Sequence, residues 1–155
     1  MNAVYTAALT LAGGVVLFVL NQWVQKFFFE PLHEQKQIIG EIDFLLILWA
    51  SSYVNPIERG ALSSEQRGER ERGSQAFREA ASRLIATTNA VRGYGLARIL
   101  PTKADAREAA RCLIGISNSM FSSGEGARRE TTKGNREWAA EVRRLLRLEA
   151  DQTGP

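Results

Sequence analysis

The sequence is poor in the residue types on which catalysis and covalent cross-linking most often depend. It holds one cysteine, Cys112, and one histidine, His33, among 155 residues. A single cysteine permits no internal disulfide, which is typical of a protein in a reducing compartment. The two side chains stand far apart in the sequence, and Cys112 lies in an apolar run, so a Cys–His catalytic pair is disfavoured. We expect Cys112 to be a small buried hydrophobic residue.

Charge is absent from the first 25 residues, and the 20 basic and 17 acidic side chains all follow, starting at Lys26. Residues 4–24 read VYTAALTLAGGVVLFVLNQWV. Crossing a bilayer takes roughly 20 such residues in a helix. Tyr5 and Trp23 stand near the two ends of the run, where aromatic side chains favour the lipid headgroups. The sequence therefore predicts one membrane-spanning helix, with the lipid bilayer as its partner.

The apolar run lacks the features of a cleaved signal peptide. No basic residue precedes it, its apolar core exceeds the usual length of about 7–15 residues, and no small-x-small cleavage site follows. We expect it to remain attached as an anchor. Lysine and arginine are confined to its C-terminal side, and cytoplasmic flanks carry the excess of these residues. The prediction is a single-pass protein of the inner membrane, with its N-terminus outside and its C-terminal domain in the cytoplasm.

The rest of the chain shows helical periodicity and no strand pattern. We predict an all-α protein: a transmembrane anchor over residues 1–25, an antiparallel bundle of about four helices over 26–150, and a flexible tail over 151–155. The net charge of +3 is small and of mixed origin, so no nucleic-acid partner is expected.

A heptad-like pattern follows the anchor. Its members alternate between spacings of four and three residues, which is typical of a helix that faces other helices: Phe28, Leu32, Gln35, Ile39, Ile42, Leu46, Trp49 and Tyr53. The apolar members from Phe28 to Trp49 are the predicted interaction seam. The helices that face it could belong to this chain or to a second copy. Further apolar residues, Ile38, Leu45 and Leu48, widen the stripe and favour a bundle within one chain. Pro31 predicts a kink near residues 27–31.

The apolar run inside residues 38–54 leaves a second topology open, in which this segment also crosses the membrane. Glu41 and Asp43 count against that reading, because a carboxylate at the bilayer centre costs several kcal/mol.

Capping signals mark the later helices. Ser63 with Gln66 predicts a helix start near Ser64. The helical pattern is clearest over residues 74–91. Thr102 with Asp105 predicts the start of a helix over 103–121. Between these helices, Gly93-Tyr94-Gly95 marks a loop that lacks the context of a dinucleotide site. Residues 122–135 carry three glycines and predict a mobile loop, followed by a last helix over 136–149.

No motif for catalysis, a cofactor or a metal is evident. Glu30, Glu34 and Glu41 share a helical stripe beside His33, but the Glu-x-x-His signature of di-metal bundles is missing. A polar site built from residues 117–119 is a further alternative, although serine and asparagine inside helices usually bond locally. Within the anchor, small residues recur every fourth position and predict a contact between membrane helices: Thr6, Thr10 and Gly14.

Three stretches carry a resemblance: FFFEPLHEQKQIIGEI at 27–42, YVNP at 53–56 and LIGISNSMF at 113–121. Together they resemble a group of short bacterial proteins with one N-terminal membrane helix and a helical cytoplasmic part, usually without an assigned function. The resemblance implies placement and fold, and it supplies no activity and no catalytic residues.

These observations favour a membrane-anchored scaffold or interaction protein without catalytic activity, whose partner is another protein or its own copies. The alternative is a membrane-active effector, holin-like or depolarising, with two membrane segments.

Overall fold

The computed structural model describes residues 3–91, 100–122 and 125–148, with the side chains at 4, 6, 8, 28, 122 and 125–128 outside the description. The fold is all-α, as predicted. Its helices and turns are α1 (Ala3–Val24), the π turn η1 (Gln25–Phe29), α2 (Glu30–Leu48), α3 (Ala50–Val54), the 3-10 turn η2 (Arg59–Ala61), α4 (Ser64–Ala90), α5 (Lys103–Asn118) and α6 (Glu125–Leu146).

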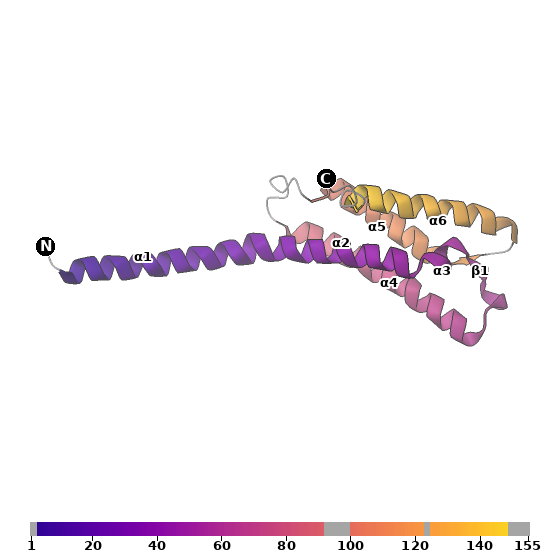
Figure 1. The fold of residues 1–155 in the computed structure, drawn as a ribbon, viewed down its shortest axis with the longest axis horizontal. Coiled ribbons are helices and arrows are strands. Elements are labelled where there is room, and N and C mark those ends of the chain that lie inside the picture. Colours follow the sequence, from indigo (N-terminus) through magenta and orange to yellow (C-terminus); the bar gives the residue numbers. More distant parts are fainter. Residues whose placement is uncertain (1–2, 92–99, 123–124, 149–155) are drawn as a thin grey trace, which may run out of the picture.

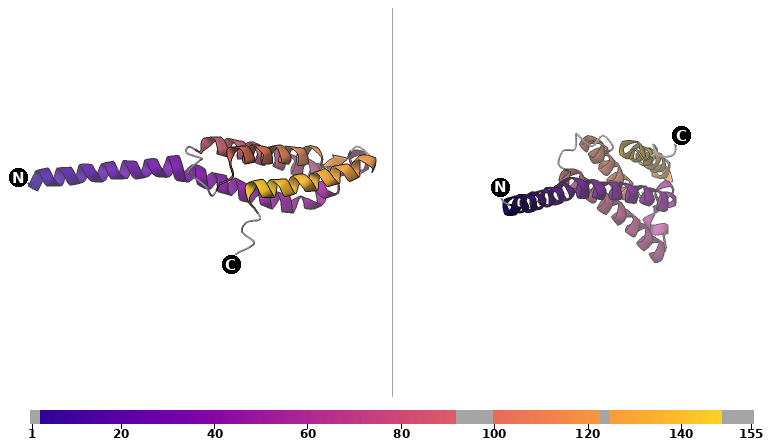
Figure 2. Two further views of the ribbon diagram at one scale, coloured as in Figure 1. Left: turned by 90° about the horizontal axis from the view of Figure 1, so that it is seen from above. Right: turned by 60° about the vertical axis from the view of Figure 1, so that its left-hand side comes forward.

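Four long helices, α2, α4, α5 and α6, form the bundle, and consecutive ones run in opposite directions (Figure 1). α4 packs on both α2 and α5, and α6 packs on α5. α1 continues the line of α2 and projects from the bundle in every view (Figures 1 and 2). The antiparallel bundle of about four helices is therefore confirmed, and its boundary with α1 lies at the π turn.

Pro31 is accommodated by a local widening of the helix, in the segment where the sequence predicted a kink. The N–H of Glu30 donates to the carbonyl of Gln25, five residues earlier. Proline has no N–H, and in a regular α-helix its ring collides with the carbonyl four residues before it. A π turn admits one extra residue and moves that carbonyl away. The ribbon consequently runs on from α1 into α2 without interruption (Figure 1).

The bundle core is built from the inward faces of the four long helices. Its largest fully buried apolar side chains come from each of these helices: Phe77, Ile38, Ile42, Leu46, Leu84, Leu113, Ile116 and Val142. On α2 the buried face also includes Gln35 and Leu45. Residues 38–54, which the sequence left open as a second membrane span, thus supply one wall of this core.

Both predicted helix starts are confirmed, because their signals are local. Ser63 and Gln66 form a reciprocal capping box at the start of α4, with both N–O distances 3.2 Å. Thr102 and Asp105 do the same at α5, at 3.1 and 3.2 Å. These bonds satisfy N–H groups that have no partner inside the first helical turn.

The predicted loop over residues 122–135 is wrong, since α6 begins at Glu125 and ends at Leu146. Asn135 holds this part of the helix against the rest of the bundle. Its side chain is fully buried, donates Nδ2 to the carbonyl of Tyr53 at 2.8 Å and accepts a bond from the Ser119 hydroxyl. Tertiary bonds of this kind offset the cost of about 1 kcal/mol for a glycine such as Gly134 inside a helix.

Two short strands close the far end of the bundle, where the sequence showed no strand pattern. β1 (Ile57–Glu58) pairs in parallel with β2 (Phe121–Ser122), with Ile57 opposite Phe121. α5 accordingly ends at Asn118, before the predicted end. Two residues are too few to produce an alternating pattern.

Arg70 joins three segments at the same end of the bundle. Its Nη1 donates to the carbonyls of Ser52 and Met120 at 2.7 and 3.1 Å, and its Nη2 donates to the carbonyl of Asn55 at 3.1 Å. These carbonyls lie at the ends of α3 and α5, where the helical pattern leaves acceptors without partners. The predicted loop at Gly93–Gly95 and the predicted tail at 151–155 lie outside the described residues.

Candidate functional site

The most distinctive surface is α1, which is apolar around its whole circumference. Its described large apolar side chains are all solvent-exposed, with exposed fractions from 44% at Val24 to 74% at Leu9. The described residues hold one helix that is long and apolar enough to cross a membrane, judged by length and composition, and its apolar window contributes nothing to the core. A buried helix of a soluble protein or a signal sequence meets the same criterion.

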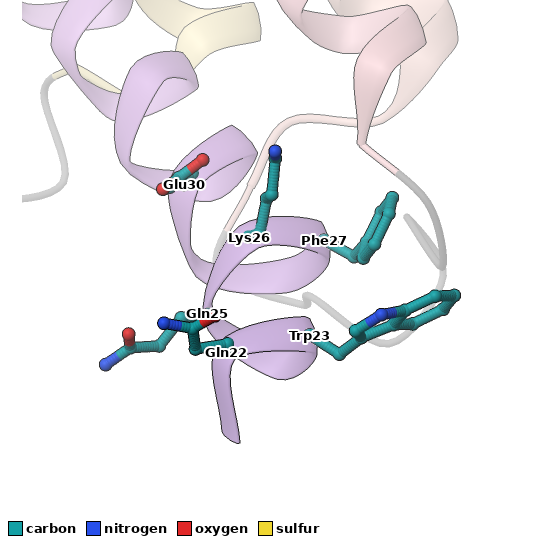
Figure 3. Close-up of a pocket in the computed structure, with 6 residues that line it drawn as sticks. All are labelled: Gln22, Trp23, Gln25, Lys26, Phe27 and Glu30. Atoms are coloured by element: carbon teal, nitrogen blue, oxygen red, sulfur yellow. The ribbon is translucent and has the colours of Figure 1, made fainter. Parts of the chain in front are cut away.

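The junction between α1 and α2 changes abruptly from apolar to polar. Trp23 and Phe27 stack one turn apart, with ring centroids 4.6 Å apart and planes tilted by 45°. Gln22 and Gln25 project on the other side of the helix, and Lys26 is the first charged residue (Figure 3). An amphipathic ring beside polar amides and a lysine is the composition that favours a lipid headgroup layer.

Two hollows at this junction are shallow, because a single helix forms each of them. One is lined by Gln22, Trp23, Gln25, Lys26, Phe27 and Glu30 (Figure 3). The other is lined by Asn21, Gln25, Phe29, Glu30, His33 and Glu34. Neither buries a ligand in the way that small-molecule sites do.

The carboxylates near the junction do not assemble a metal site in the described part of the chain. Within residues 3–91, 100–122 and 125–148, no three His, Cys, Asp or Glu side chains lie close enough together to hold a metal ion. Glu41 instead forms a two-oxygen bridge with Nη1 of Arg83 on α4, at 2.9 and 2.6 Å. Asp43 lies 3.9 Å from the guanidinium of Arg143 on α6. Both acids therefore tie α2 to its neighbours in the bundle.

The predicted interaction seam on α2 faces the chain's own bundle. Ile42 and Leu46 are fully buried, Ile39 and Trp49 pack against the core while partly exposed, and Leu32 is half-buried. The side chain of Phe28 lies outside the description. Partners that need these residues would have to compete with α4 and α6.

The buried face of α2 is rotated slightly from the predicted seam. Ile38 and Leu45, which the heptad treated as additions, are buried at 0% and 7% exposure. Gln35, the polar member of the heptad, is fully buried and donates Nε2 to Oγ1 of Thr88 at 3.3 Å.

The predicted membrane contact lies on α1. Thr10 and Gly14 are exposed, and an added Cβ at Gly14 would meet nothing within 4 Å. The side chain of Thr6 lies outside the description. The structure therefore leaves the face around Gly14 accessible to another helix.

A second apolar surface, which sequence reasoning missed, lies on the opposite side of α2 from the core. The expectation that Leu48 widens the core-facing stripe is wrong, because Leu48 lies on this outer surface. We call it the outer stripe: Gly40, Phe44, Ile47 and Leu48. The three large side chains are exposed at 60%, 63% and 53%. An added Cβ at Gly40 would meet nothing within 4 Å. The signal was present as apolar residues at spacings of three and four, but the apolar seam on the other face of the helix hid it.

The polar residues 117–119 serve the packing of α5 rather than an open site. Ser117 and Ser74 exchange hydroxyl-to-carbonyl bonds of 2.9 and 3.0 Å between α5 and α4. Arg78 donates Nε to the Ser117 hydroxyl at 2.9 Å and Nη2 to Asn118 at 2.8 Å. Ser119 bonds to the carbonyl of Gly115 at 2.8 Å. Hydroxyl groups that bond this way allow two helices to approach closely.

Cys112 is buried within α5, as predicted. Burial raises the pKa of its thiol, and the nearby Glu108 and Glu141 carboxylates add to this effect. The raised pKa favours the thiol over the reactive thiolate. His33 is exposed on α2, near the junction.

Comparisons with protein-family models, with curated proteins and with solved structures found no match. The resemblance to short bacterial membrane proteins therefore stays a prediction.

Proposed function

We propose that the protein is a single-pass, membrane-anchored helical interaction protein without catalytic activity. Exposure of the uncharged helix α1 carries the proposal. Exposed apolar patches beyond a few hundred square ångströms on soluble proteins mark surfaces that something else covers. The 22 residues of α1 would span about 33 Å at about 1.5 Å per residue, close to the roughly 30 Å of a bilayer core.

The distribution of charge supports an orientation in which the bundle lies in the cytoplasm and the N-terminus lies outside the inner membrane. Lys26 and all other basic side chains follow α1. Cytoplasmic flanks carry such an excess. The aromatic pair Trp23 and Phe27 would then lie at the cytoplasmic headgroups, and the bundle would stand directly beneath them.

The interaction role is supported by the combination of a membrane tether, α1, with a folded helical bundle. A membrane tether confines the bundle to two dimensions and raises its effective concentration toward other membrane proteins and its own copies. The alternative role as a two-span effector has less support, because α2 packs its core-facing side on α4 and pairs Glu41 with Arg83.

Membrane fractionation tests the anchor. Wild-type protein should remain in the membrane pellet after alkaline carbonate extraction. Val15→Lys with Val16→Lys should release most of it, since each lysine near a helix centre costs about 2.5–3.5 kcal/mol. Ala86→Lys with Asn89→Lys, on the exposed side of α4, is the matched control and should stay in the pellet. Wild-type protein in the carbonate supernatant would overturn the proposal.

Cysteine labelling tests the orientation in a Cys112→Ala background. A membrane-impermeant maleimide should label Ala3→Cys on intact cells and Asn89→Cys only in everted vesicles. The reverse pattern would place the bundle outside and reject the orientation while keeping the anchor.

A further inference from the structure

We propose that a second copy of this chain covers the outer stripe of α2, in a parallel arrangement in which the two stripes face each other. The proposal rests on the proposed membrane anchor, because the tether sets both the orientation and the height of the two copies. It names the partner that the proposed function leaves open.

The stripe has the spacing of a helix-pairing surface. Within the outer stripe, Gly40, Phe44 and Ile47 are separated by steps of four and three residues. Gln37 continues this spacing one step earlier, and all four are exposed on the side of α2 away from the core. Such spacing aligns side chains along one face of a helix for pairing with another helix. Gly40 has no side chain, so a partner helix can approach α2 closely there. Phe44 and Ile47, one and two turns further along α2, supply apolar contact.

The charges beside the stripe suit a parallel pair. In a parallel pair of helices with this spacing, some charged residues lie just beside the pairing surface. A residue that directly precedes such a surface position, at sequence number n, faces residue n + 5 of the partner helix. Lys36 is exposed and would face Glu41 of the other copy. The Glu41 side chain keeps 38% exposure despite its bond to Arg83, so its carboxylate remains accessible to a lysine.

The size of the patch argues for a tethered copy rather than a soluble partner. Phe44, Ile47 and Leu48 together expose roughly 300 Å² of mainly apolar surface. A stable complex between free proteins buries about 800 Å² on each partner. Two copies anchored in one membrane already share height and orientation, so a smaller contact suffices.

The π turn brings the outer stripe toward the small-residue side of α1. Phe44 follows Thr10 by 44 − 10 = 34 residues, which in a regular helix at about 100° per residue leaves the two about 160° apart. The residue inserted by the π turn removes about 100° of this separation. Thr10, Gly14 and the stripe then lie on the same half of one long helix, so one partner helix can follow both.

Disulfide cross-linking of the full chain in native membranes tests the pairing, in a Cys112→Ala background. Gly40→Cys should form covalent dimer at least fivefold more efficiently than Asn89→Cys, which is also exposed but lies on α4. Ile47→Glu should lower the Gly40→Cys yield at least fivefold, and Lys36→Glu about twofold. Ala86→Glu, an exposed change on α4, should leave the yield unchanged.

The same membranes, extracted with carbonate, separate the two proposals. Membrane-retained protein in which Gly40→Cys cross-links no better than Asn89→Cys would overturn the pairing and keep the anchor. A Gly40→Cys product of any mass other than the dimer, or a yield unaffected by Ile47→Glu, would also overturn it. Protein released by carbonate would overturn the proposed function and the tether on which the pairing depends.

Discussion

α1 and α5 are both helices rich in apolar residues, and they place those residues in opposite environments. On α5, Ala106, Leu113 and Ile116 have no solvent exposure, while Arg107 and Arg111 lie outside. On α1, Leu9 and Leu11 are each 74% exposed, and no charge divides one face from another. A charged face shows that a helix has water on one side. α1 carries no charged side chain, so its sequence marks no such side.

Glycine residues have different surroundings in the bundle and on α1. A Cβ added at Gly73 would lie 2.8 Å from the Trp49 ring, and one at Gly115 would lie 2.9 Å from the Trp138 ring. Around Gly13 and Gly14 on α1 nothing lies within 4 Å. In the bundle, glycine makes room for an indole that is already present. On α1, an added methyl group would meet nothing from this chain.

The largest expected effect is the contrast between two phenylalanines. Phe77→Ala should destabilise the bundle by about 3–5 kcal/mol, because Phe77 is fully buried and packs edge-on against Tyr53 with centroids 6.2 Å apart. Phe18→Ala on α1 should change the free energy of unfolding by less than about 0.5 kcal/mol. Urea unfolding of the full chain in mild detergent, followed by circular dichroism, measures both. Equal effects would mean that α1 belongs to the same cooperative core.

A smaller effect is expected from the glycines. Gly73→Ala and Gly115→Ala should each cost about 1–3 kcal/mol, because the methyl group must displace a tryptophan ring in a packed helix contact. Gly68→Ala is the matched control within α4. The methyl group added at Gly68 would meet no atom within 4 Å, so the substitution should stabilise the bundle by about 0.4–1 kcal/mol through helix propensity. Near-UV circular dichroism should show altered tryptophan packing in the first two variants and none in the control.

The features that the sequence predicted are those with local causes. The capping residues Ser63 and Thr102 act within three residues of themselves, so their patterns were sufficient. The part of α6 that the sequence assigned to a loop includes Asn135, whose bond to Tyr53 spans 82 residues of sequence. No local pattern carries such a bond, and the glycines around it indicated a loop instead.

The seam on α2 shows a second limit of sequence reasoning. A strict heptad places Leu32, Ile39 and Trp49 inward, but a straight helix has 3.6 residues per turn and drifts away from a repeat of 3.5. The buried side keeps the heptad members Gln35, Ile42 and Leu46 and adds Ile38 and Leu45, which lie outside the heptad. α2 carries apolar residues on both sides. The spacing of these residues therefore identifies a helix, but it does not determine which side the bundle covers.

Tyr53 provides the smallest and most specific test. It is 3% exposed, and its hydroxyl donates to the carbonyl of Leu46 at 3.0 Å. Tyr53→Phe should cost about 0.5–1.5 kcal/mol at neutral pH, the usual net value of one hydrogen bond. Tyr5→Phe, on the exposed helix α1, is the matched control and should leave the unfolding of the bundle unchanged.

The pH dependence of this effect follows from the pKa of Tyr53. Burial raises that pKa above its usual value of 10.0, and the Arg143 charge opposes the rise only in part. Below pH 10 both the folded and unfolded states hold the proton, so the full stability is present. As the pH rises above 10, the unfolded chain loses the proton first and stability falls until the folded pKa is passed. Measured from pH 8 to 11 with Cys112→Ala, whose thiol would otherwise titrate as well, Tyr53→Phe should lose less stability than the parent. An equal loss in both proteins would mean that Tyr53 titrates in the folded bundle as it does in the unfolded chain, so that burial does not raise its pKa.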